Sequence, residues 1–154
     1  MSEANPKSTK RFTVEQANNM LPLVKAITSD LVSLSKEVIE RRHRLDGLME
    51  GRDRDSGDIY TDELAEVEKG LERDVRKLQE FVNELRQLGV EPKGPGGLVD
   101  FPAELDGRQV YLCWKLGESE VLHWHEIDAG FEDRQPLTAE STAAGDFHRS
   151  EALD

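Results

Sequence analysis

The apolar residues in the first half of the chain form two long stripes at helical spacing. The first stripe consists of Val24, Ile27, Leu31, Leu34, Val38, Leu45 and Leu48. Arg41 occupies the one position in this stripe that is not filled by an apolar residue. The second stripe follows Thr61, a suitable N-cap, and consists of Leu64, Val67, Leu71, Val75, Leu78, Val82, Leu85 and Leu88. Steps of three and four residues are typical of coiled-coil helices. The pattern therefore predicts two long helices.

Local signals indicate where these helices begin and end. Thr13 and Gln16 have the spacing of a capping box, and Phe12 before the cap is placed to contact Ala17. Proline is tolerated in a first helical turn, so Pro22 predicts a short helix over 14–20 and a long helix from residue 22. The segment EGRDRDSGDIY at 50–60 predicts a loop, and Gly89 suits the end of the second helix. Residues 12–90 are thus expected to form an antiparallel helical hairpin.

After Gly89 the pattern changes to short strands. The segment EPKGPGG at 91–97 predicts a connector, and strands are expected at 98–101, 108–115 and 120–126, with Pro102 ending the first. Asp106-Gly107 is a tight-turn dipeptide. A three-stranded meander is marginal alone, so a module over 91–137 should pack on the helices. The predicted fold class is α+β: a long, coiled-coil-like antiparallel hairpin followed by a small three-stranded antiparallel β-meander.

The composition limits the classes of function. The chain has 154 residues, of which 36% are hydrophobic, and a net charge of −12. This acidity argues against a nucleic-acid partner, and no apolar run is long enough for a membrane span. The start lacks the apolar segment of a secretory signal, and the single Cys113 excludes an internal disulfide. We expect a cytoplasmic protein without a membrane partner, with disordered ends over 1–11 and 138–154.

Ionisable and aromatic residues crowd into the stretch 110–134. His123 and His125 are two residues apart, so they share one face of a strand, and with Asp128 they form a candidate metal site. The alternative explanation is structural: His125 donates a hydrogen bond to Asp128 or Asp100, while tryptophans pack the sheet on the helices. The register also stays open, because a four-residue turn at 116–119 puts His123 opposite Leu112, whereas an odd loop puts it opposite Cys113.

The same stretch contains candidate ligand-binding residues, which are Trp114, Glu118, His125, Asp128 and Arg134. The charged residues Lys115, Glu118, Glu120 and Arg134 could bind a charged ligand or form an ion-pair network that fixes the C-terminal segment, and the network is the favoured interpretation. Cys113 lies between Leu112 and Trp114 and is interpreted as a small buried hydrophobe rather than a nucleophile. We predict no catalytic residue and no organic cofactor; a divalent metal (zinc, iron or manganese) is the cofactor that this stretch could bind.

Several longer motifs resemble a bacterial family classed only as a domain of unknown function. They are an FTxxxANxxLP opening at 12–22, GLVDFP at 97–102, YLCWKLGE at 111–118 and WHEIDAGFEDRQPL at 124–137. The resemblance implies a helical hairpin with a C-terminal signature and brings no activity with it. His123 stands where an aromatic residue is expected in such relatives. By motif position the signature residues would be Asp100, Trp114, Glu118, Trp124, His125, Asp128, Gly130, Arg134 and Pro136.

Two functions follow as hypotheses. We favour a non-enzymatic interaction or scaffold protein, because two helices cover only part of each stripe and the remaining apolar edge requires a partner. Such a protein would form a homodimer through its helices and present a surface to an unidentified protein partner. The alternative is a metal-binding or small-molecule-binding protein, a hydrolase included, with its site around His125, Glu118, Asp128 and Arg134.

Overall fold

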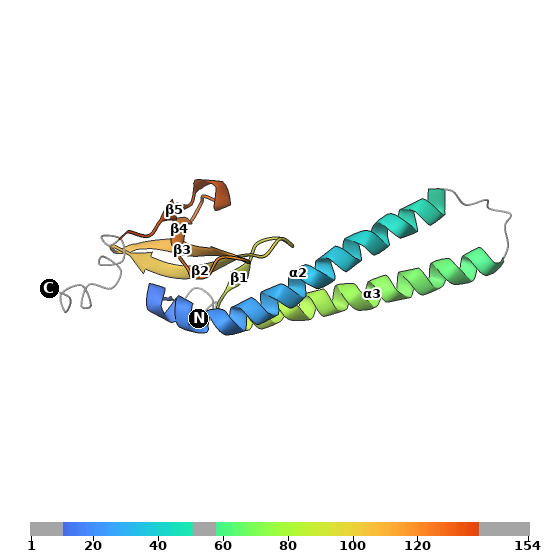
Figure 1. Cartoon of the computed structure of the whole chain (residues 1–154), viewed down its shortest axis with the longest axis horizontal. Helices are drawn as coiled ribbons and strands as arrows, with labels where there is room; N and C mark the ends of the chain where they lie inside the picture. Colours follow the sequence, from blue (N-terminus) through green and yellow to red (C-terminus); the bar gives the residue numbers. More distant parts are fainter. Residues whose placement is uncertain (1–10, 51–57, 139–154) are drawn as a thin grey trace, which may run out of the picture.

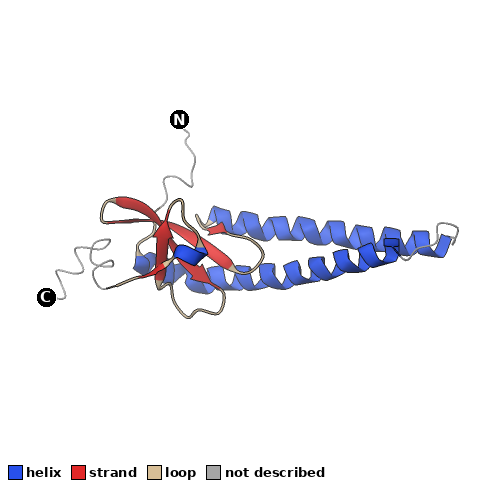
Figure 2. Ribbon diagram, turned by 90° about the horizontal axis from the view of Figure 1, so that it is seen from above, coloured by secondary structure: helices blue, strands red, loops and turns tan. Residues whose placement is uncertain are grey.

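A long helical hairpin carries a small antiparallel sheet near its open end (Figures 1 and 2). The structure, a computed structural model, describes residues 11–50 and 58–138. Helix α2 (Val14–Glu50) and helix α3 (Asp58–Gln87) lie side by side and project well beyond the sheet. No helix within these ranges has the length and apolar character needed to cross a bilayer. The predicted α+β class is confirmed, while the predicted disordered ends fall almost wholly outside the described residues.

The start of α2 is fixed by the predicted capping box. The amide of Thr13 donates to Oε1 of Gln16, and the amide of Gln16 donates to Oγ1 of Thr13, each over 3.0 Å. Phe12 is buried with its ring edge-on to Phe101, 5.2 Å between centroids, and its amide donates to the Pro102 carbonyl. The cap therefore joins the first helix to the sheet.

The predicted break at Pro22 is wrong, since α2 runs without interruption from Val14 to Glu50. Pro22 lacks the amide proton that would bond to the Asn18 carbonyl, a loss that usually kinks or ends a helix. Here Leu21, directly before the proline, and Val24, two residues after it, are buried in the core. Packing against the sheet thus holds the helical conformation through the proline.

The two predicted stripes face each other along the hairpin. Val24, Leu31 and Val38 are buried, and the remaining members of the first stripe are half-buried. Arg41, at the gap in that stripe, forms an ion pair with Asp74 of α3. The gap is therefore filled by a polar contact between the helices, and the stripe continues beyond it through Leu45 and Leu48.

Helix α3 starts earlier than predicted and ends as predicted. It begins at Asp58, so Thr61 lies inside the helix and is not its N-cap; the rest of the predicted loop, 51–57, lies outside the described residues. At the other end, Gly89 has φ 93°, and the amides of Gly89 and Val90 donate to the carbonyls of Arg86 and Leu85. This pair of bonds is a Schellman motif, which satisfies the last helical carbonyls.

The sheet has five strands instead of the predicted three, and each strand pairs antiparallel with the next in the order β1-β2-β3-β4-β5. The two extra strands have two residues each, too short to give an alternating pattern in the sequence. The strands are β1 (Glu91–Pro92), β2 (Leu98–Leu105), β3 (Arg108–Lys115), β4 (His123–Glu126) and β5 (Gln135–Pro136).

Two strand boundaries differ from the prediction for identifiable reasons. Pro102 does not end β2, because its carbonyl accepts a bond from Phe12 and its nitrogen faces that same side, away from β3, so no ladder bond is lost. The third predicted strand begins at His123 rather than residue 120. The amide of Val121 instead donates to Oδ1 of Asn18 over 2.7 Å, which draws this segment toward α2.

Alternation gives the sheet an apolar face and a polar face. Side chains on one face, among them Phe101, Leu112 and Trp114, form the core with the ends of α2 and α3. The other face carries Asp100 and Cys113 together with His125, and the segment 127–137, with the short 3₁₀-helix η1 (Phe131–Asp133), lies over it. The sheet therefore separates the core from a second, partly polar layer.

Candidate functional site

Three buried side chains from three neighbouring strands meet on the polar face of the sheet. Asp100 of β2 pairs directly with Cys113 of β3, and His125 of β4 lies opposite Tyr111, two residues from Cys113 on the same face. One carboxylate oxygen, the thiol sulfur and one imidazole nitrogen lie within 4.8 Å of one another. We call these three residues the Asp-Cys-His cluster. It is the only such trio of His, Cys, Asp or Glu within the described residues.

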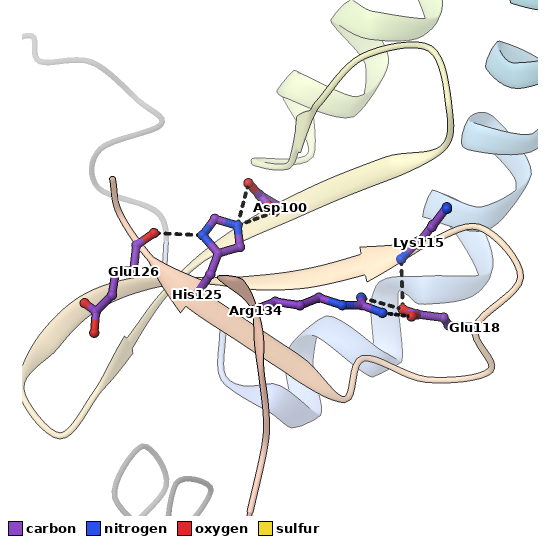
Figure 3. Close-up of polar contacts among 6 residues, drawn as sticks. All are labelled: Asp100, Lys115, Glu118, His125, Glu126 and Arg134. Atoms are coloured by element: carbon purple, nitrogen blue, oxygen red, sulfur yellow. Dashed lines mark hydrogen bonds and ion pairs between the residues drawn. The ribbon is translucent and has the colours of Figure 1, made fainter. Parts of the chain in front are cut away.

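The orientation of His125 is fixed through both ring nitrogens (Figure 3). Nδ1 lies 2.7 Å from the backbone carbonyl of Glu126, and because a carbonyl only accepts, Nδ1 carries a proton. Nε2 lies 3.1 Å from each carboxylate oxygen of Asp100. The Nε2–carboxylate bond then needs a further proton, held by either Nε2 or Asp100. The buried pair thus shares one removable proton.

Burial shapes the protonation of the other two members. It raises the pKa of Asp100 above its ordinary value, although the positive charges of His125 and Lys93 act in the opposite direction. Burial and the negative charge of Asp100 raise the pKa of Cys113 to about 11, against the opposing effect of Arg134. The thiol is therefore protonated at neutral pH, and Cys113 is not an activated nucleophile. The prediction that Cys113 is buried is confirmed.

The donor types of the cluster are those that bind metal ions. Nε2 and the Asp100 oxygens lie 3.1 Å apart, a separation that both a hydrogen bond and two ligands of one tetrahedral ion have. A histidine that binds a metal through Nε2 typically donates Nδ1–H to a backbone carbonyl or a carboxylate, and His125 does so. The trio offers one nitrogen, one oxygen and one sulfur donor.

A cavity of about 170 Å³ lies beside the cluster. Asp100 and His125 form part of its wall, Lys93 and Tyr111 add polar groups, and the rest is apolar: Leu98, Ile127, Ala129, Gly130 and Phe131. The ammonium of Lys93 lies 5.7 Å from the centre of the Tyr111 ring. Asp100 and His125, both buried, thus border a small, partly apolar space.

Next to the cluster, an ion pair fastens the segment that covers it. The Arg134 guanidinium forms a two-pronged ion pair with Glu118 (Figure 3). It also stacks on Phe131, with 4.3 Å between the guanidinium carbon and the ring centre. Glu118 also accepts from the Lys115 amide over 3.0 Å, and its own carbonyl accepts from Nε1 of Trp114 over 2.9 Å. Of the predicted ion-pair network, the structure shows the pair between Glu118 and Arg134.

The structure separates the candidates that the sequence grouped together. Trp114, Glu118 and Arg134 belong to the set of hydrogen bonds and ion pairs that holds the segment 127–137, which we call the fastening network. His125 belongs to the Asp-Cys-His cluster. Asp128 is exposed and is not part of the cluster. The partner of His125 is Asp100, the second of the two carboxylates considered.

His123 also stays outside the cluster. It lies opposite Cys113, so the register is the one expected from an odd loop, and the two histidines share a face as predicted. Its nitrogens are not among the atoms of the trio, and its buried Nδ1 has no hydrogen-bond partner within the described residues. The metal set proposed from sequence, His123, His125 and Asp128, is therefore not assembled in this structure.

The sequence predicted Asp100 only as a possible hydrogen-bond partner of His125 and Cys113 only as a buried hydrophobe, although it contains the signal that joins the two residues. A two-residue turn at Asp106-Gly107 pairs Leu105 with Arg108, and counting back five residues along β2 and forward five along β3 places Asp100 opposite Cys113. The turn was predicted, but the strand pairing that it implies was not followed as far as residues 100 and 113.

The chain matches one protein family over residues 10–137, DUF2203, whose description is an uncharacterised conserved protein. The match contains both helices, all five strands, the cluster and the fastening network. No curated protein and no solved structure matches the chain. Because the match covers most of the sequence, the chain belongs to the DUF2203 family.

Proposed function

We propose that the protein binds one divalent transition-metal ion through Asp100, Cys113 and His125. The observation that carries this proposal is the hydrogen bond from Nδ1 of His125 to the Glu126 carbonyl, which directs Nε2 toward a buried carboxylate and a buried thiol. Neutral imidazole, thiolate and carboxylate are the three side-chain donors that zinc uses. The proposal keeps His125 from the sequence-based site and replaces its other members.

Zinc is the metal that this donor set favours, with iron second. A thiolate selects for zinc or iron over magnesium, calcium and manganese, which prefer oxygen ligands. Three protein ligands leave one position of a tetrahedral ion for water or substrate, as in catalytic rather than structural zinc sites. The cavity beside Asp100 and His125 offers space on that side. The function best supported is therefore that of a metal protein with an open coordination position.

The test compares two conservative substitutions of aspartate. Asp100→Asn keeps the shape of the buried side chain and can donate a hydrogen bond to Nε2 of His125, but it removes the ligand charge. Asp128→Asn changes the exposed aspartate of the sequence-based metal set. We expect the wild type and Asp128→Asn to bind one zinc per chain. Asp100→Asn should lose more than about 100-fold in affinity, because outer-shell changes alone cost about 10–100-fold.

The measurement is a competition titration of metal-free protein against a chromophoric zinc chelator, beside circular dichroism to show that the variants are folded. Equal zinc affinity in the wild type and folded Asp100→Asn would contradict the site. Loss of zinc binding in Asp128→Asn alone would instead support the metal site predicted from sequence, which consists of His123, His125 and Asp128.

We also propose that the hairpin forms a dimer interface with a second copy of the chain. On α3, Leu71 and Val82 are half-buried and Val75 is 39% exposed, so this row of apolar residues continues beside the contact with α2. On α2, Ile39 is 49% exposed. Both helices project beyond the sheet (Figure 1), so a second hairpin has room to pack along them in a four-helix bundle.

A further inference from the structure

The cavity beside the Asp-Cys-His cluster has walls of two kinds. At one end are the metal-ligand candidates Asp100 and His125, and nearby are the ammonium group of Lys93 and the ring of Tyr111. The remaining walls are apolar and come from β2 and from the covering segment, with Leu98, Ile127, Ala129 and Phe131 among them. Such a mixture, a few polar groups in a mostly apolar space, is typical of small-molecule sites.

A second, larger space adjoins this cavity. It has a volume of about 480 Å³ and shares Lys93, Tyr111 and Ile127 with the smaller one. Its other walls include Gln109 and Glu91, and both carboxylate oxygens of Glu91 already accept from Arg86. The two spaces are therefore neighbours with three shared wall residues, and the larger one is of the size that small ligands occupy.

The charges favour an anion at this junction. Lys93 lines both spaces, and it is the only lysine or arginine among the described residues that line the smaller cavity. Once Asp100 and Cys113 bind a divalent ion, their two negative charges are neutralised by the metal. The positive charge of Lys93 then has no opposing charge within the smaller cavity, whose described walls contain no acidic group other than Asp100.

We propose that this cavity binds a small carboxylic acid with a short apolar chain. One carboxylate oxygen would occupy the open coordination position of the metal, the other would accept from the ammonium of Lys93, and the chain would lie against Leu98, Ile127 and Phe131. The proposal rests on the metal-binding function and adds the ligand class. Carboxylate and lysine form a charge-assisted hydrogen bond, and the apolar walls favour a ligand with an apolar chain over a fully polar oxyanion.

The experiment uses the full-length protein loaded with Co²⁺, whose visible spectrum reports the coordination of the ion. The probes are acetate, butyrate and inorganic phosphate, each titrated at constant ionic strength maintained with sodium chloride. We expect a saturable spectral change with carboxylates and tighter binding of butyrate than of acetate, because burial of each additional CH₂ contributes about 0.8 kcal/mol. Phosphate should bind more weakly than butyrate.

Two lysine variants make a matched pair for this test. Lys93→Gln removes the ammonium from the cavity wall, whereas Lys77→Gln removes an exposed lysine of α3 that does not line the cavity. We expect Lys93→Gln to weaken butyrate binding at least about tenfold, as the loss of a charge-assisted bond implies, while the variant still binds cobalt. Lys77→Gln should behave as wild type.

The outcomes separate this inference from the metal site. Cobalt binding without any saturable change on adding carboxylate would overturn the inference and leave the metal site standing. Tighter binding of phosphate than of butyrate, or equal weakening in both lysine variants, would also overturn it. Failure of the wild type to bind cobalt would overturn the metal site and the ligand with it.

Discussion

The thiol of Cys113 and the Asp100–His125 pair each hold a proton that a metal ion would displace. Burial and the charge of Asp100 raise the pKa of Cys113 to about 11, so the metal-free thiol is neutral across the physiological range. Nε2 of His125 and the Asp100 carboxylate share one further proton. Because zinc binds the deprotonated forms of these groups, protons and metal compete for the same atoms.

This competition gives a pH dependence with a definite sign. Zinc binding should release two protons near neutral pH, one from Cys113 and one from the Asp100–His125 pair, so affinity should rise with pH by up to about 100-fold per unit. Calorimetric titrations in two buffers of different ionisation enthalpy count the protons. Cys113→Ser should release one proton fewer, and a wild-type count of zero would show that zinc binds elsewhere.

At the residue scale, sequence reasoning identified His125 and named Asp100 as one of its two possible hydrogen-bond partners, but it placed neither Asp100 nor Cys113 in the metal site. The period of a strand correctly placed His123 and His125 on one face. The position of Asp100 depends on a hairpin register across two strands, and the separation of Asp128 from His125 depends on the path of the turn after β4. Neither is a property of local periodicity. Carboxylates near a histidine in sequence were therefore favoured over one that is near in space.

Among the elements, the segment 127–137 is fastened over the sheet by Glu118 and Arg134. Burial of Glu118 opposes its ionisation, but the bonds from Arg134 and the Lys115 amide prevail, so its pKa is lowered. A carboxyl with a lower pKa in the folded state stabilises the protein above its unfolded-state pKa. That contribution is lost as the pH falls through the folded-state pKa.

Glu118→Gln should accordingly destabilise the protein by about 1–2 kcal/mol at neutral pH, because charged hydrogen bonds are replaced by neutral ones. The difference from wild type should shrink as the pH falls from about 7 to about 3, below the ordinary pKa of glutamate. Urea unfolding at several pH values measures both effects. Glu120→Gln, an exposed neighbour, is the control; a pH-independent loss of stability in Glu118→Gln would argue against the ion pair as its cause.

The helical elements were easier to predict than the strands. Stripes of seven and eight apolar residues carry a strong periodic signal, and the Thr13–Gln16 box and Gly89 mark real ends. The break at Pro22 was wrong because tertiary packing overrides a local preference. The strands β1 and β5 have two residues each and are defined only by the neighbours with which they pair. Short edge strands of this kind leave no pattern in the sequence.

At the scale of the whole molecule, the proposed dimer predicts that the molar mass measured in solution is twice that of one chain. Val75→Glu places a charge in the half-exposed row of α3 and should convert the dimer to monomers of unchanged helical content, measured by light scattering and circular dichroism at one concentration. Lys77→Glu is the control, since residue 77 lies about 200° around the helix from residue 75. A wild-type mass of one chain, or equal dissociation in both variants, would rule out this interface.

The proposed dimer interface and the proposed metal site lie in separate parts of the molecule. The apolar row lies along the projecting hairpin, while the Asp-Cys-His cluster lies on the far side of the sheet from the core. Substitutions that separate the chains should therefore leave zinc affinity unchanged, and Asp100→Asn should leave the mass unchanged. Independent behaviour of the two is expected for sites with no shared contacts.

X-ray absorption at the zinc edge tests the central claim most directly, because it identifies the atoms bound to the metal. With one equivalent of zinc, the account predicts one sulfur neighbour at about 2.3 Å and nitrogen or oxygen neighbours at about 2.0–2.2 Å, with the sulfur signal lost in Cys113→Ser. A zinc shell with only nitrogen and oxygen neighbours in the wild type would contradict the Asp-Cys-His site.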